Sequence, residues 1–462
     1  MRWSVLIVVL SIVVVSAAQE GQLQSDFRRE GEHIKESCGA FSFKSAASCA
    51  EELVTDHPLH IALGSLSPQN GFGFGAAFVT HYTPNEDWRL SWDADAVGST
   101  NGSWRAGAYM KIIHTPVEHI TVVTNPSGQP KKNTLAVHPY TVFNLYAQAI
   151  SLNTLFFFGL GPDSTLAGRS VFGMTETIVG TDVIKPFKGG LNLALLGEVN
   201  GRFVSLRGDY GQSSPSIEQL YTNVTAPGLA SQPAFVQLGE GVRIKPVLFH
   251  DHLQLNYLAS FQQFFAPSNS TYSFRRWTID LDNEVPLYRN SKSFAPKDTN
   301  GPDECAQTVG GEKCPSISRN REGSIGFRFL LAESAASAGS VVPFYFQPTL
   351  GGSDINGNPV LSSYQDYRFR APNLLLLRES FEHSIWGPFG FTFTADQGKV
   401  ALIRSDIDFQ NLKHSFATGF TLRAGGAPQV FLLFAWGGSE GHHTIASMNT
   451  SLLGGSVRPS LY

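Results

Sequence analysis

The sequence predicts an all-β protein, a closed antiparallel transmembrane β-barrel of about sixteen strands. The first observation is a period of two, in which apolar residues alternate with polar or small ones over segments of about ten residues. Trp88–Ala96 and Trp104–Ile112 follow this pattern, and Phe389–Thr394 repeats it with phenylalanines. Because successive side chains of a strand point to opposite faces, each segment builds one apolar and one polar face. An exported chain can turn such apolar faces to lipid.

The composition is the second observation. Charged residues make up 16% of the chain, whereas soluble proteins carry about 25%. The 34 Phe and 45 Gly are abundant, as expected for lipid-facing aromatic surfaces and curved strands. Beyond the N-terminal segment no stretch reaches the roughly 20 apolar residues of a spanning helix, which excludes a helical membrane protein. The net charge of -4 predicts no nucleic-acid partner.

The N-terminus has the pattern of an export signal, the third observation. Residues 1–18 combine a positive start, an apolar run at Val5–Val15 and a small-residue cleavage site at Ser16–Ala18. The run is too short for a spanning helix, and an uncleaved anchor is the alternative. We expect residues 19–58 to form a short periplasmic or barrel-mouth segment and residues 59–462 to form the barrel.

The four cysteines lie as two local pairs, Cys38 with Cys49 and Cys305 with Cys314. Because an exported chain meets an oxidising compartment, the spacing predicts two short-loop disulfides. Three pairings are formally possible, and metal binding by the scattered thiols is the alternative. We predict no cofactor.

Strand candidates follow one another from Leu59 onward, separated in part by turn signals such as Thr83-Pro84-Asn85. The sheet must close, since an open edge in lipid leaves unpaired backbone groups. A periplasmic or secreted soluble all-β protein is the alternative. The clearest candidates are Phe72–Tyr82, Trp88–Val97, Trp104–Ile113, Tyr140–Leu152, Leu191–Leu206, Leu253–Phe265, Tyr272–Leu287, Ile325–Leu331, Val341–Gln347, Asn373–His383, Phe389–Val400, Phe416–Arg423, Val430–Trp436 and Thr444–Leu453.

Three connections are long and polar, namely Gly208–Gly241, Asn290–Arg321 and Gly351–Ala371. Long loops at one end and short turns at the other are typical of bacterial outer-membrane barrels. We therefore expect all three to lie at the same end.

Two stretches resemble the barrel of the bacterial surface antigen family, the outer-membrane assembly and two-partner-secretion barrels. NTLFFFGLGPDS at Asn153–Ser164 is similar to the family's aromatic-Phe-Gly-x-Gly-Asn-Asp/Ser strand end. Gln347–Leu377 and Thr394–Val400 resemble its Leu-Gly-Gly segment, long loop, Arg-Phe strand and Phe-x-Asp-x-Gly strand. Five strand candidates follow the loop, as in the family barrel. The matching residues are Gly351, Gly352, Tyr364, Arg368, Phe369, Arg370, Asp396 and Gly398.

The resemblance implies that the loop 351–371 folds into the lumen. In the family an arginine at the loop tip pairs with the strand aspartate. Here Ser362-Ser363 replaces the Arg-Gly of the tip, so Asp396 lacks its usual partner, and we expect Arg368 or Arg370 to substitute.

This sequence also departs from the family pattern at features that bear on the family's activity. Thr394 stands in place of the aromatic residue of the strand motif. Residues 19–58 are too few for a polypeptide-transport-associated domain, with which assembly and secretion members receive clients. The resemblance therefore implies the architecture of the loop and strands more than it implies an activity.

Gly437–Gly441 matches the Gly-x-Ser-x-Gly nucleophile elbow, with His442 and His443 beside it. That elbow requires a strand, a sharp turn and a helix. Because the following Thr444–Leu453 reads as a strand, a glycine-rich turn around Ser439 explains the match without catalysis.

Other polar clusters have a chemical and a structural interpretation. His250-Asp251-His252 has a spacing that can bind a metal, although a strand-end cluster is the simpler interpretation. Carboxylates could bind calcium or be solvated, namely Asp280, Asp282, Glu284, Asp303 and Glu304. Five charged residues of the first strands should face the lumen together, namely Arg89, Asp93, Asp95, Arg105 and Lys111.

The sequence thus predicts a channel or transport barrel of surface-antigen type in the outer membrane of a Gram-negative-type bacterium. The loop 351–371 would gate or plug it. The expected partners are outer-membrane lipid and periplasmic or outer-membrane assembly proteins, and we expect no enzymatic activity. One alternative is an assembly or secretion barrel working with a separate periplasmic partner. The other is an outer-membrane hydrolase on a barrel scaffold.

Overall fold

The computed structural model describes most of the chain between residues 59 and 448. The predicted export signal, the segment 19–58 and the four cysteines all lie outside the described residues. Within residues 59–448, the positions not described are 86, 115–139, 188, 209–213, 250–251, 295–316, 387–388 and 425–426.

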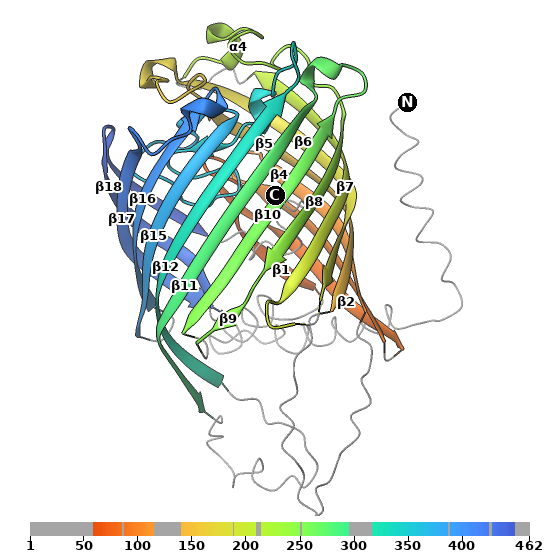
Figure 1. Ribbon diagram of the computed structural model, residues 1–462, viewed down its shortest axis with the longest axis vertical. Coiled ribbons are helices and arrows are strands. Elements are labelled where there is room, and N and C mark those ends of the chain that lie inside the picture. Colours follow the sequence, from red (N-terminus) through yellow and green to blue (C-terminus); the bar gives the residue numbers. More distant parts are fainter. Residues whose placement is uncertain are drawn as a thin grey trace, which may run out of the picture.

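Long antiparallel strands make up the described chain (Figure 1). Each main strand pairs with the next main strand in sequence, so the sheet is an up-and-down meander. The strands are β1 (Leu59–Ser65), β2 (Phe72–Asn85), β3 (Trp88–Ser99), β4 (Trp104–His114), β5 (Thr141–Phe157), β6 (Ser170–Pro186), β7 (Leu193–Gly208), β8 (Phe235–Ile244), β9 (Val247–Leu248), β10 (Leu253–Phe265), β11 (Phe274–Phe294), β12 (Ile317–Ala336), β15 (Asn373–Trp386), β16 (Phe389–Ala401), β17 (Lys413–Ala424), β18 (Ala427–Gly438) and β19 (Gly441–Met448).

Over the described residues, the wall has sixteen strand positions. The main sheet contains 17 segments, of which β8 and β9 share one position because both pair with β10. The first strand, β1, lies in contact with the last, β19, so the sheet curves round into a nearly closed barrel. The predicted fold class and strand number are confirmed.

Side-chain burial alternates around this wall, as the period of two requires. Outward side chains are apolar and exposed, and Phe203 of β7 is 52% exposed. Inward side chains on the same and neighbouring strands are polar and bonded to one another, and Gln237 of β8 is 0% exposed. An apolar exterior around a polar interior is the arrangement of a barrel in lipid.

The described connections between strands differ at the two ends. Figure 1 shows the helical segments at the upper end and the two-residue β9 at the lower end. Residues 214–234 of the predicted connection Gly208–Gly241 and the predicted connection Gly351–Ala371 both lie at the upper end. Asn290–Arg321 was expected there too, and this prediction is wrong: β11 and β12 remain paired as far as Phe294 and Ile317, and these strand ends lie at the lower end (Figure 1).

Some strand predictions also need correction. Ser170–Pro186 was missed because its first five residues are all buried, which hides the alternation. Phe235–Gly241 was placed in a loop but begins β8. Val341–Gln347 is not a strand: a 3-10 turn follows Pro343, whose fixed φ and missing N–H disfavour a sheet position.

Helical segments are short and lie in the connections. They are η2 (Leu166–Gly168), α4 (Ile217–Leu220), η3 (Ser270–Tyr272), η5 (Phe344–Phe346) and η6 (Arg404–Asp406). Among the described residues, none of the helices has the length and apolar character needed to cross a membrane.

The segment between β12 and β15 fills the upper part of the barrel. It contains η5 and a separate two-stranded sheet of β13 (Thr349–Leu350) and β14 (Phe369–Arg370). Two apolar clusters pack around it: Phe344 of η5 contacts Phe157 and Phe172 of the wall, and Leu350 packs with Phe369 and neighbouring residues of β15 and β16.

Candidate functional site

We call residues 351–371 the lumen loop. Most of its residues are buried inside the barrel, which confirms the expected inward fold. Its entry requires two glycines: Gly351 has φ +111° and Gly352 has φ +61°. A Cβ on Gly351 would lie 2.4 Å from the Cβ of Arg368, and one on Gly352 would lie 2.5 Å from the backbone nitrogen of Asp366. The predicted Gly-Gly therefore allows the first residues of the loop to lie in contact with Asp366 and Arg368 near its end.

The tip of the lumen loop is held by Asp396 of β16. The backbone N–H of Leu361 donates to Asp396 Oδ2 at 2.9 Å. Arg378 of β15 donates to the same carboxylate from Nε and Nη2 at 2.7 and 2.8 Å, and its Nη2 also donates to the Pro359 carbonyl. Asp396 thus joins the loop tip to a bidentate ion pair in the wall.

The expected partner of Asp396 was wrong. Arg378, rather than Arg368 or Arg370, forms the ion pair, because the register of β15 and β16 places Arg378 directly opposite Asp396. Its signal in the sequence is an arginine in the strand that follows the loop.

Arg368 instead links the loop to two other connections. Its Nε donates to Glu440 Oε1 in the β18–β19 turn. Its Nη1 donates to Ser164 Oγ at 2.8 Å and its Nη2 to the Ser164 carbonyl at 2.6 Å. The guanidinium lies over the rings of Phe158 and Phe369, at 5.0 and 4.6 Å.

The two stretches that carried the family resemblance therefore meet in the lumen. Gly161 donates its N–H to the Arg370 carbonyl at 2.8 Å, forming an isolated β-bridge. Ser164 contacts Arg368, as described above. Tyr364 packs edge to face on Phe369, with ring centroids 5.2 Å apart. The structure brings together the residues that the sequence placed more than 180 positions apart, as the 204-residue separation of Ser164 and Arg368 illustrates.

Gly398 also belongs to this site. A Cβ there would lie 3.0 Å from both Leu350 Cδ1 and the Leu375 carbonyl. The glycine therefore leaves room for the residue that precedes the lumen loop to pack against β16.

The β1–β2 turn is a contact that the sequence did not reveal. Tyr367 Oη donates to the Pro68 carbonyl at 3.0 Å and lies 2.8 Å from Ser67 Oγ. Gln69 Nε2 donates to Asp366 Oδ2 at 2.7 Å. Burial raises the pKa of Asp366 above its usual range, and the Gln69 hydrogen bond opposes this rise.

Strand β17 provides a further anchor. The backbone N–H of Ser363 donates to Ser415 Oγ of β17 at 2.8 Å. The lumen loop is thus attached to the β1–β2 turn, the β5–β6 connection, β15–β17 and the β18–β19 turn, and it crosses the barrel.

The nucleophile-elbow pattern lies in a hairpin turn. Ser439 is exposed and joins β18 directly to β19, so the helix that an elbow requires does not follow. Glu440 of this turn binds the lumen loop instead.

The remaining charged clusters either form ion pairs within the wall or lie partly outside the described residues. Among the described residues, no group of His, Cys, Asp and Glu has metal-site geometry; His250, Asp251, Asp303 and Glu304 lie outside them. Asp280 forms an ion pair with Arg328 at 2.8 Å. The register places the charged residues of β3 and β4 on the inward face, as expected, and Asp95 pairs with Arg105 at 2.7 Å.

Comparisons with known proteins concern the barrel. No family model matches the sequence, and no curated protein matches it. Among solved structures, BamA from Haemophilus ducreyi lacking POTRA domains 1–3 matches with 10% identity and a TM-score of 0.45, over 84% of this chain and 68% of that one. CdiB from Escherichia coli matches with 13% identity and a TM-score of 0.45, over 85% and 60%. CdiB from Acinetobacter baumannii matches with 10% identity and a TM-score of 0.42, over 85% and 56%. The chain thus spans 56 to 68% of the length of these structures.

Proposed function

We propose that this chain is a transport barrel of the bacterial outer membrane whose lumen loop acts as a plug or gate. The observation that carries the proposal is the attachment of a buried loop to opposite sides of the wall. Leu361 is bonded to Asp396 of β16, while Arg368 is bonded to Ser164 in the β5–β6 connection. Strands β6 and β16 lie seven of the sixteen strand positions apart, so the two attachments lie on opposite sides of the barrel. A loop held on both sides obstructs the lumen, and its release would open a path along the polar interior.

The composition of the loop contacts supports a gate rather than a permanent core. Apolar packing is supplemented by hydrogen bonds and ion pairs whose partners would face water once the loop moves, as those of Arg368 and Glu440 would. Such contacts can exchange for water with a small net change in free energy. An apolar exterior and the export-signal pattern of residues 1–18 fit an outer-membrane location.

Single-channel conductance of the folded full-length barrel in a planar bilayer tests this proposal. We expect low or rare conductance for the natural protein. Asp396→Ala removes the acceptor of both Leu361 and Arg378 and leaves a guanidinium without its counter-ion. It should destabilise the docked loop by about 3 kcal/mol and give frequent, larger openings.

Asp95→Ala is the matched control. Asp95 is also a buried, inward carboxylate paired with an arginine of the adjacent strand, Arg105, and this ion pair joins β3 to β4 and does not involve the lumen loop. Both variants should lose heat stability, but only Asp396→Ala should change conductance. Equal conductance in the two variants would refute the gating role of the loop.

An assembly or secretion barrel that works with a separate periplasmic partner is the second candidate. The observation that favours it is the seam, where the 7-residue β1 meets the 8-residue β19. Among the described residues no hydrogen-bonded ladder joins these two strands, and an open strand edge can accept a client strand.

Photo-crosslinking distinguishes this candidate. A crosslinking residue at Ile61, outward on β1, should capture other barrel proteins during their assembly if the seam receives clients. The same residue at Phe203, outward on the continuous wall, is the control. Equal capture at both positions would exclude a role of the seam.

We also propose that the chain is not an enzyme. The hydrolase alternative depends on Ser439, which lies in a hairpin turn. If the purified barrel hydrolyses a lipase or esterase substrate and Ser439→Ala abolishes this activity, the hydrolase alternative is correct and this proposal fails.

A further inference from the structure

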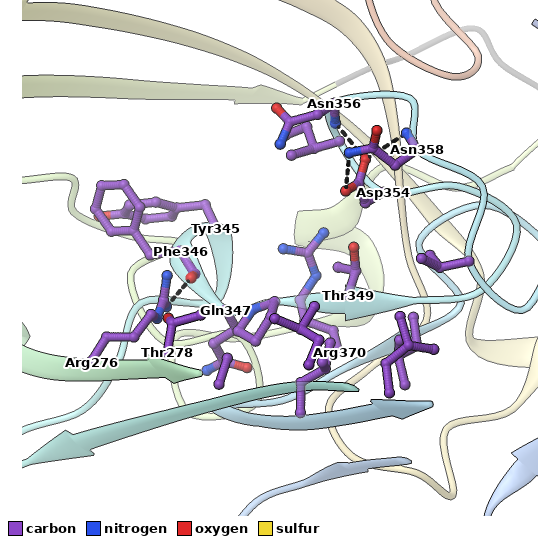
Figure 2. A pocket seen from close by; sticks show the side chains of 18 of the residues that line it. Arg276, Thr278, Tyr345, Phe346, Gln347, Thr349, Asp354, Asn356, Asn358 and Arg370 are labelled. Atoms are coloured by element: carbon purple, nitrogen blue, oxygen red, sulfur yellow. Dashed lines mark hydrogen bonds between the residues drawn. The ribbon is translucent and has the colours of Figure 1, made fainter. Parts of the chain in front are cut away.

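A cavity of about 560 Å³ lies beneath the lumen loop, inside the barrel. Its walls come from β6, β7, β11, β12 and β15, and it is covered by η5, β13, β14 and the first half of the loop (Figure 2). This volume falls within the range of small-molecule sites, about 300–1,000 Å³. Four arginines line the cavity, namely Arg202, Arg276, Arg328 and Arg370.

Two of the four arginines are neutralised by carboxylates. Arg202 pairs with Glu176 at 2.7 Å, and Arg328 makes a bidentate pair with Asp280 at 2.8 Å for both bonds.

Arg276 of β11 is held without a carboxylate. Its Nε donates to Ser334 Oγ at 3.0 Å and its Nη2 to the Phe346 carbonyl. Its guanidinium lies over the rings of Phe264 and Phe274, at 5.8 and 5.5 Å. These neutral contacts fix the orientation of the guanidinium and leave its charge uncompensated.

Arg370 of β14 is in the same situation. Its Nη1 donates to the Phe344 carbonyl at 2.8 Å, and its guanidinium lies 5.8 Å from the Phe344 ring centroid. The residue is 5% exposed, and its Nε has no hydrogen-bond partner in the described part of the chain. Within those residues neither Arg276 nor Arg370 has a carboxylate within 4.0 Å, the distance that defines an ion pair.

The acidic residues of the cavity are engaged elsewhere. Glu176 bonds to Arg202, and Asp354 Oδ1 accepts the backbone N–H groups of Asn356 and Asn358 at 2.9 Å each. Figure 2 shows Asp354 with these asparagines, apart from Arg276. The region of the cavity near Arg276 and Arg370 therefore carries excess positive charge.

We propose that this cavity binds a small oxyanion, such as phosphate or a carboxylate, between Arg276 and Arg370. Arginine keeps its charge when buried and presents a planar fork of donors that matches the oxygens of phosphate and carboxylate. A buried, uncompensated guanidinium is costly, and an anion on it offsets that cost. The proposal needs only the folded barrel and holds whether or not the barrel conducts.

Isothermal titration of inorganic phosphate into the detergent-folded full chain tests the proposal, at ionic strength held constant with chloride. We expect saturable binding of phosphate and no comparable binding of chloride. Arg276→Gln and Arg370→Gln should each weaken phosphate binding at least tenfold. Arg275→Gln is the matched control, because Arg275 is the neighbouring residue on the opposite, exposed face of β11. It should bind phosphate as the natural protein does.

Two results would overturn the proposal: absence of phosphate binding by the natural protein, or equal binding by the Arg276→Gln/Arg370→Gln double variant. Circular dichroism and heat-dependent gel mobility establish that each variant is folded. If Arg370→Gln does not fold, Arg370→Lys keeps the charge, removes the fork, and should still weaken binding. Because titration does not depend on conduction, a negative result here leaves the conductance test of the lumen loop unaffected.

Discussion

At the scale of single residues, the lumen loop is organised by a few polar side chains that act as fixed acceptors. Asp396 accepts from the Leu361 backbone and from Arg378. Glu440 accepts from Arg368. Each of these carboxylates connects a residue of the loop to the wall, so each is an expected point of control over the position of the loop.

Asp366 makes this control sensitive to pH. Its pKa is raised by burial, so the folded state holds the proton more tightly than the unfolded chain does. The stabilising contribution of the protonated group is complete below the unfolded pKa of about 3.9 and is lost as the pH rises through the higher folded value.

We therefore expect Asp366→Asn to stabilise the docked loop at neutral pH. The variant should also reduce the pH dependence of the melting temperature between the unfolded and folded pKa of Asp366. Thermal unfolding of both proteins at a series of pH values measures this effect. Parallel pH profiles of the two proteins would show that Asp366 does not contribute to the pH dependence of the melting temperature. Asp163→Asn is a control, because Asp163 is exposed on the β5–β6 connection.

At the scale of elements, the lumen loop depends on its glycine hinge. A substitution at Gly352 meets two obstacles, a positive φ of +61° and a backbone nitrogen 2.5 Å from the new Cβ. Gly357 shares the first obstacle, with φ +85°, but nothing lies within 4 Å of a Cβ there. The two positions thus separate the cost of backbone strain from the cost of close approach.

We predict that Gly357→Ala costs about 1 kcal/mol, the usual penalty of a left-handed residue, and that Gly352→Ala costs clearly more and loosens the loop. Limited proteolysis of the folded barrel should detect faster cleavage within residues 351–371 of Gly352→Ala. Equal cleavage of the two variants would mean that the close contact between Gly352 and Asp366 does not stabilise the docked loop.

At the scale of the whole molecule, the barrel has one face for lipid and another for water. Val199 of β7 is 50% exposed on the outer face, and Asn200 beside it is buried in the polar interior. Because a charge facing hydrocarbon is costly, Val199→Arg should lower the free energy of unfolding by about 2–4 kcal/mol in lipid vesicles.

Val199→Leu is the control for this prediction and should change the free energy by less than about 1 kcal/mol. Urea unfolding of both variants in vesicles, followed by tryptophan fluorescence, gives the two values. A Val199→Arg variant as stable as Val199→Leu would place this face outside the hydrocarbon.

Much of the architecture follows from local patterns in the sequence. The period of two predicted an all-β barrel of about sixteen strands, because strand side chains alternate whatever their neighbours are. Gly351-Gly352 marked the entry to the lumen loop as part of the motif that resembles the surface antigen family, and the structure leaves no room for a Cβ at either position. Ser170–Pro186 was missed where burial on both faces removes the alternation on which the prediction depends.

The partners of the loop were decided by the tertiary structure. Asp396 pairs with Arg378 because the register of β15 and β16 places them opposite one another. The sequence of one strand does not by itself determine its register with a neighbouring strand. The uncompensated charges of Arg276 and Arg370 likewise result from folding, which places two distant arginines on one cavity and their neighbouring carboxylates elsewhere. The sequence by itself determined the strands of the barrel, because alternation acts locally, and the family resemblance implied the inward loop; only the tertiary structure decided which side chains meet inside the barrel, because those contacts depend on how distant segments are placed.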